Sequence, residues 1–276
     1  MPKLRIFLIS ISAKWQVFTI LVMTVLSAFV IAFTAGLLFH RPELTENIDL
    51  TTAVYQVLGT LYAVLLAFVV SGVWQNFSKA ALSVQAEANA LSDLVHLANS
   101  SAISNQHDIR SMALLYSKVV VEDEWHVLGM QHGDVLDIHE ISRDSSNTLT
   151  DAVLSFQPEN NHDTVVFGQA LTLLSNWLDA RRTRILMARG NSAKALWPLL
   201  ITGAIILFSF HGLFYVRAPE LWALVLLAMS LIVGVCFYLI FSLDCPYTGK
   251  PFVDSEPFKW AISWFEKSTL DPKSIL

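Results

Sequence analysis

Side chains that could bind a metal occur together in the run Glu122-Asp123-Glu124-Trp125-His126. In a helix Glu122 and His126 would lie one turn apart, on the same face. Carboxylate and imidazole groups both bind metals, but a protein site normally uses three or four ligands. No third residue has a clear spacing to this pair. Glu122 and His126 are therefore weak metal candidates, and a polar contact between helices or a solvated face is the better interpretation.

Two further groups of ionisable residues invite a functional interpretation. Arg181, Arg182, Arg184 and Arg189 could contact anionic lipid headgroups or form ion pairs with the acidic run at 122–124, and we favour the ion pairs. His211 is the ionisable residue deepest within an apolar run, and such residues are often functional in membranes. Because it lies near the outer end of its run, we expect a neutral histidine at the interface.

Sequence motifs of catalysis are absent from the chain. It contains no GxSxG, P-loop, GxGxxG or HExxH pattern, and no basic aromatic patch of a nucleic-acid-binding protein. We therefore expect no enzymatic activity, no cofactor and no nucleic-acid partner. An enzyme acting on lipid would have to use Glu122, Glu124 and Arg181, and this is the weakest alternative.

The elements that carry these residues are dominated by long apolar runs. Hydrophobic residues make up 54% of the chain and charged residues 15%, against about 45–50% and about 25% in soluble domains. A helix of about 20 apolar residues spans a bilayer, and four stretches without Asp, Glu, Lys or Arg are long enough. These predicted spans are Gln16–Phe39, Leu50–Ser78, Ala195–Val216 and Leu221–Leu243.

Lysine and arginine residues indicate the orientation of these spans. They are concentrated before the first span, in the middle region and after the fourth span. The link between the first and second spans contains only one such residue, Arg41, and the link between the third and fourth spans contains only Arg217. Because positive residues favour the cytoplasmic side, both termini and the middle region are predicted to be cytoplasmic. Cys236 and Cys245 then lie in or beside the membrane on the reducing side, where we expect no disulfide.

The fold predicted from this pattern is an all-α membrane protein, with two transmembrane hairpins flanking a cytoplasmic helical bundle. Residues 1–76 are predicted to form an N-terminal segment with the first hairpin, and residues 77–194 the cytoplasmic domain. The second hairpin is predicted at 195–243 and a cytoplasmic tail at 244–276. The cytoplasmic domain should contain four helices: one continuous with the second span to about 101, then helices from about 104 to 125, from 134 to before 158 and from 161 to 190. A short helix is expected at 258–265 in the tail.

Apolar and small residues recur at alternating spacings of four and three on the helix that follows the second span, which is typical of a helix packed along a neighbour. This stripe is Phe77, Ala81, Val84, Ala88, Leu91, Val95 and Ala98.

Small residues recur every four positions in two of the spans, which allows close approach of helices in lipid. They are Ala28, Ala32 and Gly36 in the first span, and Gly59, Ala63, Ala67 and Ser71 in the second. Packing inside one subunit and packing between subunits, or around a pore, both explain such stripes.

A weakly polar face of the second span suggests a pore lining. It consists of Gln56, Thr60, Ala63, Ala67, Val70 and Trp74. Further along the same helix, Glu87 flanks the apolar stripe. If that stripe faces neighbouring subunits, Glu87 would form a ring of carboxylates, which favours cations. A buried seam within one subunit remains the alternative.

Several short segments in a fixed order resemble a family of bacterial membrane proteins called bestrophin-like. They are Gly59-Thr60-Leu61-Tyr62-Ala63, Glu87-Ala88, Val121-Glu122-Asp123-Glu124-Trp125, Leu178-Asp179-Ala180-Arg181-Arg182, Leu243-Asp244-Cys245-Pro246-Tyr247-Thr248-Gly249 and Glu256-Pro257-Phe258. The resemblance extends over about residues 55 to 265. The family commonly has Arg and Phe around the proline where this chain has Cys245 and Tyr247.

The resemblance implies a homo-oligomeric ion channel with four spans, cytoplasmic termini and a pore lined by the second membrane helix. An apolar neck would map, by position, to Leu65, Phe68 and Val69. We therefore expect an ion channel in the bacterial inner membrane, with the bilayer, inorganic ions and copies of itself as partners. The alternative is a non-conducting scaffold or sensor whose cytoplasmic domain binds a protein.

Overall fold

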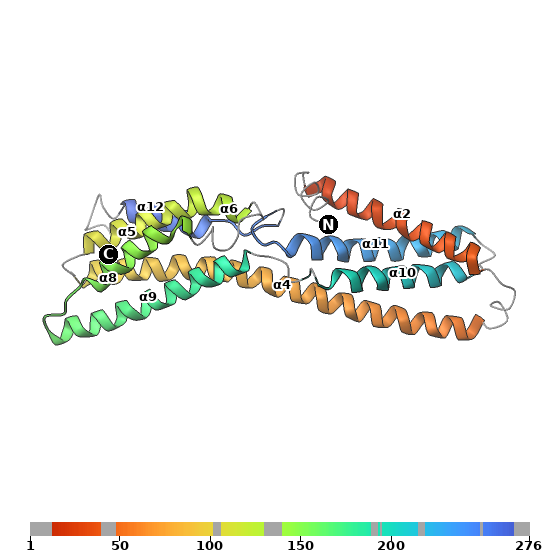
Figure 1. Cartoon of the computed structure of the whole chain (residues 1–276), viewed down its shortest axis with the longest axis horizontal. Helices are drawn as coiled ribbons and strands as arrows, with labels where there is room; N and C mark the ends of the chain where they lie inside the picture. The colour runs from red at the N-terminus through yellow and green to blue at the C-terminus, as the bar shows by residue number, and fades with distance from the viewer. Residues whose placement is uncertain are drawn as a thin grey trace. The chain divides into compact units, whose positions relative to one another are not determined.

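The computed structural model describes residues 13–39, 48–101, 106–129, 140–188, 193, 195–214, 219–248 and 251–267. All regular elements in these ranges are helices (Figure 1). The chain forms two compact units. Unit 1 comprises Met1–Asn76 with Asn191–Asp244, and unit 2 comprises Phe77–Gly190 with Cys245–Leu276.

Unit 1 contains the apolar helices. These are α2 (Ala13–Phe39), the first part of α4 (Ile48–Ser100), α10 (Trp197–Leu213) and α11 (Pro219–Leu243). Three of them, α2, α4 and α11, are long and apolar enough to cross a membrane. The fourth, α10, has 17 residues, or roughly 26 Å at about 1.5 Å per residue. Three predicted spans thus have spanning length, and the crossing of α10 belongs to the proposal below.

Close helix packing in unit 1 centres on α2, which lies along both α10 and α11 (Figure 1). The small residues Ala28 and Ala32 of α2 are completely buried. A Cβ atom added to Gly212 of α10 would lie 2.0 Å from the carbonyl oxygen of Ala32. The backbones of α2 and α10 therefore meet directly, and the small residues of the first span serve packing within the subunit.

Unit 2 is built from the second part of α4 and shorter helices. These are α5 (Gln106–Val119), the π-helical turn η1 (Val120–Glu124), α6 (Trp125–Gly129), α8 (Arg143–Leu154), α9 (Asn161–Met187) and α12 (Glu256–Lys267). The prediction that the second span continues as one helix to about 101 is confirmed. The predicted start of the next helix at 104–105 lies outside the described residues, as does Asp134.

Helix α9 begins where its sequence predicts. The side chain of Asn160 accepts a hydrogen bond of 2.8 Å from the backbone N–H of Asp163, which satisfies one of the free donors at the helix start. The π-helical turn η1 was not predicted. It inserts an extra residue between α5 and α6, and such turns are frequent at functional sites.

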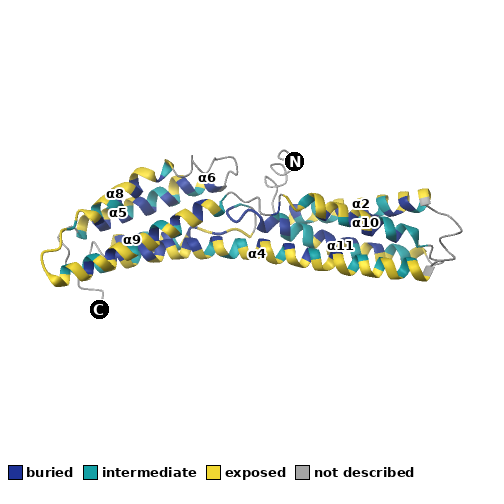
Figure 2. Cartoon of the chain, turned by 60° about the horizontal axis from the view of Figure 1, so that its bottom comes forward, coloured by how far each residue is buried: buried dark blue, intermediate teal, exposed yellow. Residues whose placement is uncertain are grey.

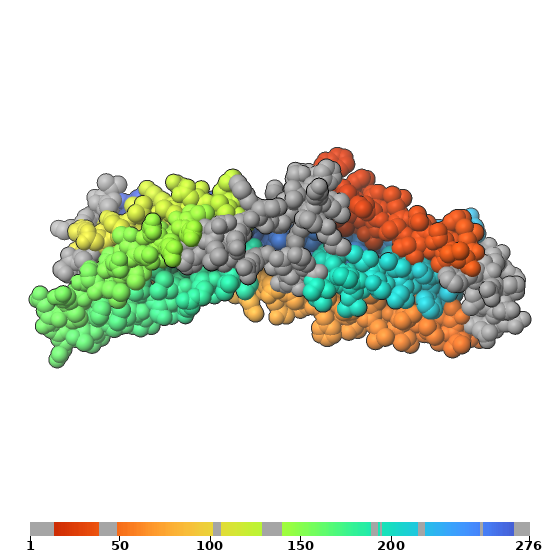
Figure 3. Space-filling model, in the orientation of Figure 1, coloured from red at the N-terminus to blue at the C-terminus, as the bar shows by residue number. Residues whose placement is uncertain are grey.

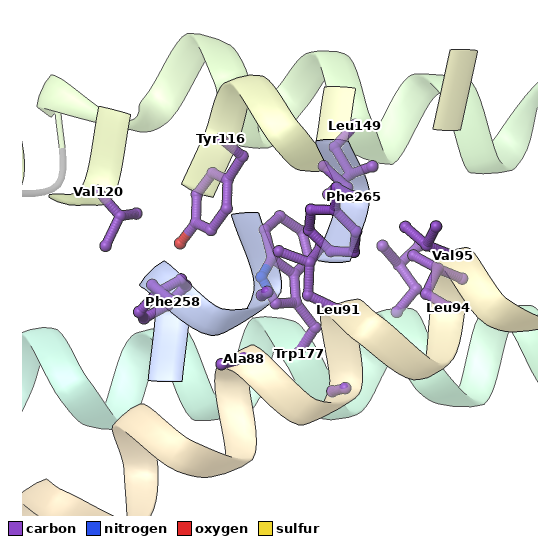
Figure 4. Packing of buried hydrophobic residues seen from close by; sticks show 14 of the residues in the cluster. Ala88, Leu91, Leu94, Val95, Tyr116, Val120, Leu149, Trp177, Phe258 and Phe265 are labelled. Carbon is purple, nitrogen blue, oxygen red and sulfur yellow. The ribbon is translucent and has the colours of Figure 1, made fainter. Parts of the chain in front are cut away.

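The core of unit 2 is formed by the stripe predicted along α4. Val84, Ala88, Leu91, Val95 and Ala98 are buried, and Phe77 and Ala81 pack beside them. Figure 4 shows side chains from α5, α8, α9 and α12 converging on this stripe, among them Tyr116, Leu149, Trp177 and Phe265. The seam thus packs against helices of its own chain.

Candidate functional site

The candidate pore face lies on the part of α4 that belongs to unit 1. Most of the predicted lining side chains are exposed there, namely Gln56, Thr60, Ala63, Ala67, Phe68 and Trp74. Leu65 and Val70 are half-buried, and Val69 is buried. Figure 2 shows exposed residues recurring along α4 between buried and intermediate ones, and Figure 3 shows part of its first half uncovered beside α10.

The opposite side of the same helix faces its own subunit. Tyr62, Leu66, Val69 and Val73 are all at most 6% exposed, and their spacings of four, three and four place them on one side of a helix. Val69 therefore belongs to the subunit core and is no longer a candidate for the apolar neck. Phe68, 73% exposed, points away from this core.

Aromatic side chains attach α4 to the rest of unit 1. The hydroxyl of Tyr62 donates a 2.9 Å hydrogen bond to the carbonyl oxygen of Leu200. The Tyr62 ring covers Gly203, where an added Cβ atom would lie 2.5 Å from it. This contact therefore helps to fix the direction in which the exposed face of α4 points.

His211 takes part in the same attachment. It is buried, and its Nδ1 atom lies 3.4 Å from the hydroxyl of Tyr55 on α4. Its Nε2 atom lies 3.2 Å from the carbonyl oxygen of Trp222, whose indole N–H donates to the carbonyl oxygen of His211. The imidazole is therefore a partnered packing residue inside unit 1.

Glu87 lies elsewhere, inside unit 2, in a buried ion-pair cluster. Nε of Arg184 lies 2.6 Å from Oε2 of Glu87, and Nη1 of Arg184 lies 2.8 Å from Oε1 of Glu124; all three side chains are completely buried. The hydroxyl of Tyr116 donates a hydrogen bond to Glu87. The prediction that Glu87 forms a carboxylate ring toward a pore is corrected by these contacts, since its charge is used within the subunit.

Burial and charge set the protonation states in this cluster. Burial raises the pKa of Tyr116 well above its usual value, and the negative charge of Glu87 raises it further. Burial alone would lower the pKa of Arg184, but the carboxylates of Glu124 and Glu87 outweigh it, and the pKa is raised. Arg184 therefore stays charged and Tyr116 stays a hydrogen-bond donor at neutral pH.

The predicted partners of the arginines are partly confirmed. Arg184 pairs with Glu124 of the acidic run. Arg182 pairs instead with Asp179 on the surface, and Nη2 of Arg181 donates to the hydroxyl of Ser142. Arg189 lies outside the described residues.

The weak metal candidates receive no support from the geometry. Glu122 and His126 are both exposed. Within the ranges described above, no group of three or more His, Cys, Asp or Glu side chains is placed to hold a metal ion.

Comparisons with known proteins agree with the arrangement of helices. Residues 22–258 match the family model of the Bestrophin-like domain. Among solved structures, the chain resembles the crystal structure of a bacterial bestrophin homologue from Klebsiella pneumoniae, a variant with one substitution. The two share 15% identity and a TM-score of 0.65, over 94% of this chain and 99% of that chain. No curated protein sequence matches the chain significantly.

Proposed function

Because this chain belongs to the bestrophin-like family, we propose that it forms a homo-oligomeric ion channel in which the first part of α4 lines the central path. The observation that carries this proposal is the uncovered face of α4. The face contains small and weakly polar residues, Gln56, Thr60, Ala63 and Ala67, that the described helices of unit 1 leave exposed.

A face of this composition suits contact with water and with copies of the same chain better than contact with lipid alone. Thr60 and Gln56 offer hydrogen-bonding groups, and alanines let neighbouring helices approach. The small residues of α2, by contrast, are already covered by α10. The stripe on α4 is thus the one still available for assembly.

The proposed constriction is Phe68. Its side chain is 73% exposed. It lies one helical turn beyond Val64 and about 100° around the helix from Ala67. Rings of large apolar side chains close a pore by excluding water. The proposal includes Leu65 and Val70 at the margins of the lining, and omits Val69 and Glu87, whose side chains are buried in the subunit.

Ion preference follows from the charges that remain. The stretch from Leu50 to Ser78 carries no charged side chain, and Glu87 is buried in an ion pair with Arg184. The lining itself therefore supplies no ring of charge, and the cation preference that a ring of Glu87 carboxylates would produce is not expected. Selectivity would depend on the two mouths of the path.

The proposed channel is tested by recording from purified protein in planar bilayers. We expect currents from the unmodified protein and a larger unitary conductance after Phe68→Ala. Phe33→Ala is the matched control, because Phe33 is 64% exposed on α2 and would face lipid; its conductance should not change. Silent bilayers with both unmodified and Phe68→Ala protein, over varied pH, calcium and voltage, would favour the scaffold instead.

The proposed placement is the bacterial inner membrane, with all four apolar helices crossing and unit 2 in the cytoplasm. Single cysteines introduced near residue 134 or at the C-terminus should be protected from an impermeant reagent in intact cells. Cysteines at positions 45 and 218 should react. Labelling of position 134 from outside would contradict this topology.

A further inference from the structure

A groove of about 430 Å³ lies on unit 2, between α4 and α12. One wall is a stripe of polar residues on α4, and the other is a stripe of aromatic residues on α12. The lining residues are Gln85, Ala88, Asn89, Ser92, Asp93, His96, Pro257, Trp260, Ala261 and Trp264. Its volume falls in the range of small-molecule sites, about 300–1,000 Å³.

The groove exists because its floor is made of small residues. Ala88 on α4 and Ala261 on α12 are 2% and 5% exposed, and both line the groove. A larger side chain at either position would fill the space between the helices. On α12 the neighbouring positions Phe258 and Phe265 turn into the core (Figure 4), which leaves Trp260 and Trp264 to form the wall.

The two indoles differ in how firmly they are held. Trp264 is half-buried and contacts the rings of His96 and Phe265, with centroid distances of 6.4 Å and 5.4 Å. Trp260 is 68% exposed, and none of the residues that the structure describes stacks on it or bonds to it. The groove therefore offers a ligand the exposed indole face of Trp260, next to the packed ring of Trp264.

The charge of the lining decides which ligand suits it. Asp93 is the one carboxylate, and the lining contains no lysine or arginine. In the described parts of the chain no side chain forms an ion pair with Asp93. An indole face attracts cations, and a nearby carboxylate adds to that attraction. An anion would be repelled by Asp93 and would find no lysine or arginine in the lining to offset that repulsion.

From this combination we propose that the groove binds a small organic cation, such as a quaternary ammonium or alkylated amine, between Trp260 and Asp93. The cation lies against the indole face with its charge toward the carboxylate, and Gln85 and Asn89 are available to hydrogen-bond its polar groups. This site belongs to unit 2 and does not depend on the proposed channel.

Calorimetric titration of the full-length protein with choline tests the proposal. The protein is kept in a maltoside detergent, because phosphocholine detergents and lipids carry the same headgroup. The matched ligand is 3,3-dimethyl-1-butanol, which has the shape of choline without its charge. We expect saturable binding of choline and no measurable binding of the neutral analogue.

Variants then locate the site. Trp260→Leu should weaken choline binding by about fivefold or more, the loss expected from roughly 1 kcal/mol of cation–π attraction, and Asp93→Asn should weaken it as well. Controls are Trp15→Leu, an exposed indole on α2, and Asp151→Asn, an exposed carboxylate on α8; neither should change the affinity.

Three results would overturn the proposal: no binding of choline, equal binding of the neutral analogue, or unchanged affinity in both groove variants. If choline does not bind and Trp260→Leu alters the mass of the assembly instead, the groove is a contact between copies of the chain.

Discussion

The guanidinium of Arg184 on α9 pairs with the carboxylate of Glu87 on α4, with Nε 2.6 Å from Oε2 and both side chains completely buried. The pair joins residues 97 positions apart. A buried ion pair is costly to break because the remaining charge has no partner. The Glu87–Arg184 contact therefore fixes how α9 packs on α4 in unit 2.

Substitution of Glu87 by glutamine should destabilise unit 2 without changing ion preference. Removal of one partner of a buried pair costs about 3–5 kcal/mol, so we expect the midpoint of thermal unfolding in detergent to fall by about 6–20 °C. Asp179→Asn is the control, because its pair with Arg182 is about 70% exposed and should contribute at most about 1 kcal/mol. If folded Glu87→Gln protein shows a shifted reversal potential, the charge of Glu87 acts on the permeating ions and the residue belongs to the pore lining.

The hydrogen bond from Tyr116 to Glu87 should make the free energy of unfolding depend on pH in the alkaline range. The pKa of Tyr116 is raised in the folded protein from its ordinary value of 10.0. Below pH 10 the full contribution of the hydroxyl is present. Above pH 10 the Tyr116 hydroxyl loses its proton in the unfolded chain but keeps it in the folded chain, so the stability of the folded protein falls as pH rises.

Tyr116→Phe tests this dependence. The variant should be less stable than the unmodified protein by about 1–3 kcal/mol at pH 8, because Glu87 loses a donor. The difference should narrow between pH 10 and 11. Thermal unfolding of both proteins across this range is the measurement, and a constant or widening gap would contradict the assignment.

Gly212 should tolerate no side chain. A Cβ atom there would lie 2.0 Å from a backbone oxygen of α2, and a backbone cannot rotate aside as a side chain does. We expect Gly212→Ala to destabilise unit 1 by about 3 kcal/mol through overpacking. Gly168→Ala on α9, where an added Cβ meets nothing within 4 Å, should instead stabilise its helix by about 0.5–1 kcal/mol. Equal stability of the two variants would show that α2 and α10 do not approach this closely.

The uncovered stripe on α4 should control assembly. Ala63→Leu and Ala67→Leu add bulk where neighbouring subunits are proposed to meet, so we expect a smaller or altered oligomer by native mass spectrometry or light scattering. Ala228→Leu, at an exposed position of α11, should leave the mass unchanged. Unaltered mass in both α4 variants would mean that this face contacts lipid.

The two stripes of small residues, in α2 and α4, show what residue spacing can and cannot predict about helix packing. Their spacings in α2 and α4 are alike, and both predict close packing. Only the tertiary structure distinguishes them, because Gly212 of α10 meets Ala32 of α2, whereas Ala63 and Ala67 stay exposed in their own unit. Which of two similar faces is covered depends on a third helix far along the chain.

The sequence alone determined those features that depend on neighbouring residues. Runs without charge specify apolar helices, the alternation of four and three along α4 specifies its buried seam, and the start of α9 near Asn161 was predicted from its neighbouring residues. The role of Glu87 could not be determined in this way. A carboxylate beside an apolar stripe suits a pore wall or a buried ion pair equally well, and only the folded chain brings Arg184 to within 2.6 Å of it. Contacts across 97 positions leave no periodicity in the sequence, so the pairing of Glu87 with Arg184 was decided by tertiary structure, whereas pairing of the arginines with the acidic run at 122–124 was expected from charge alone.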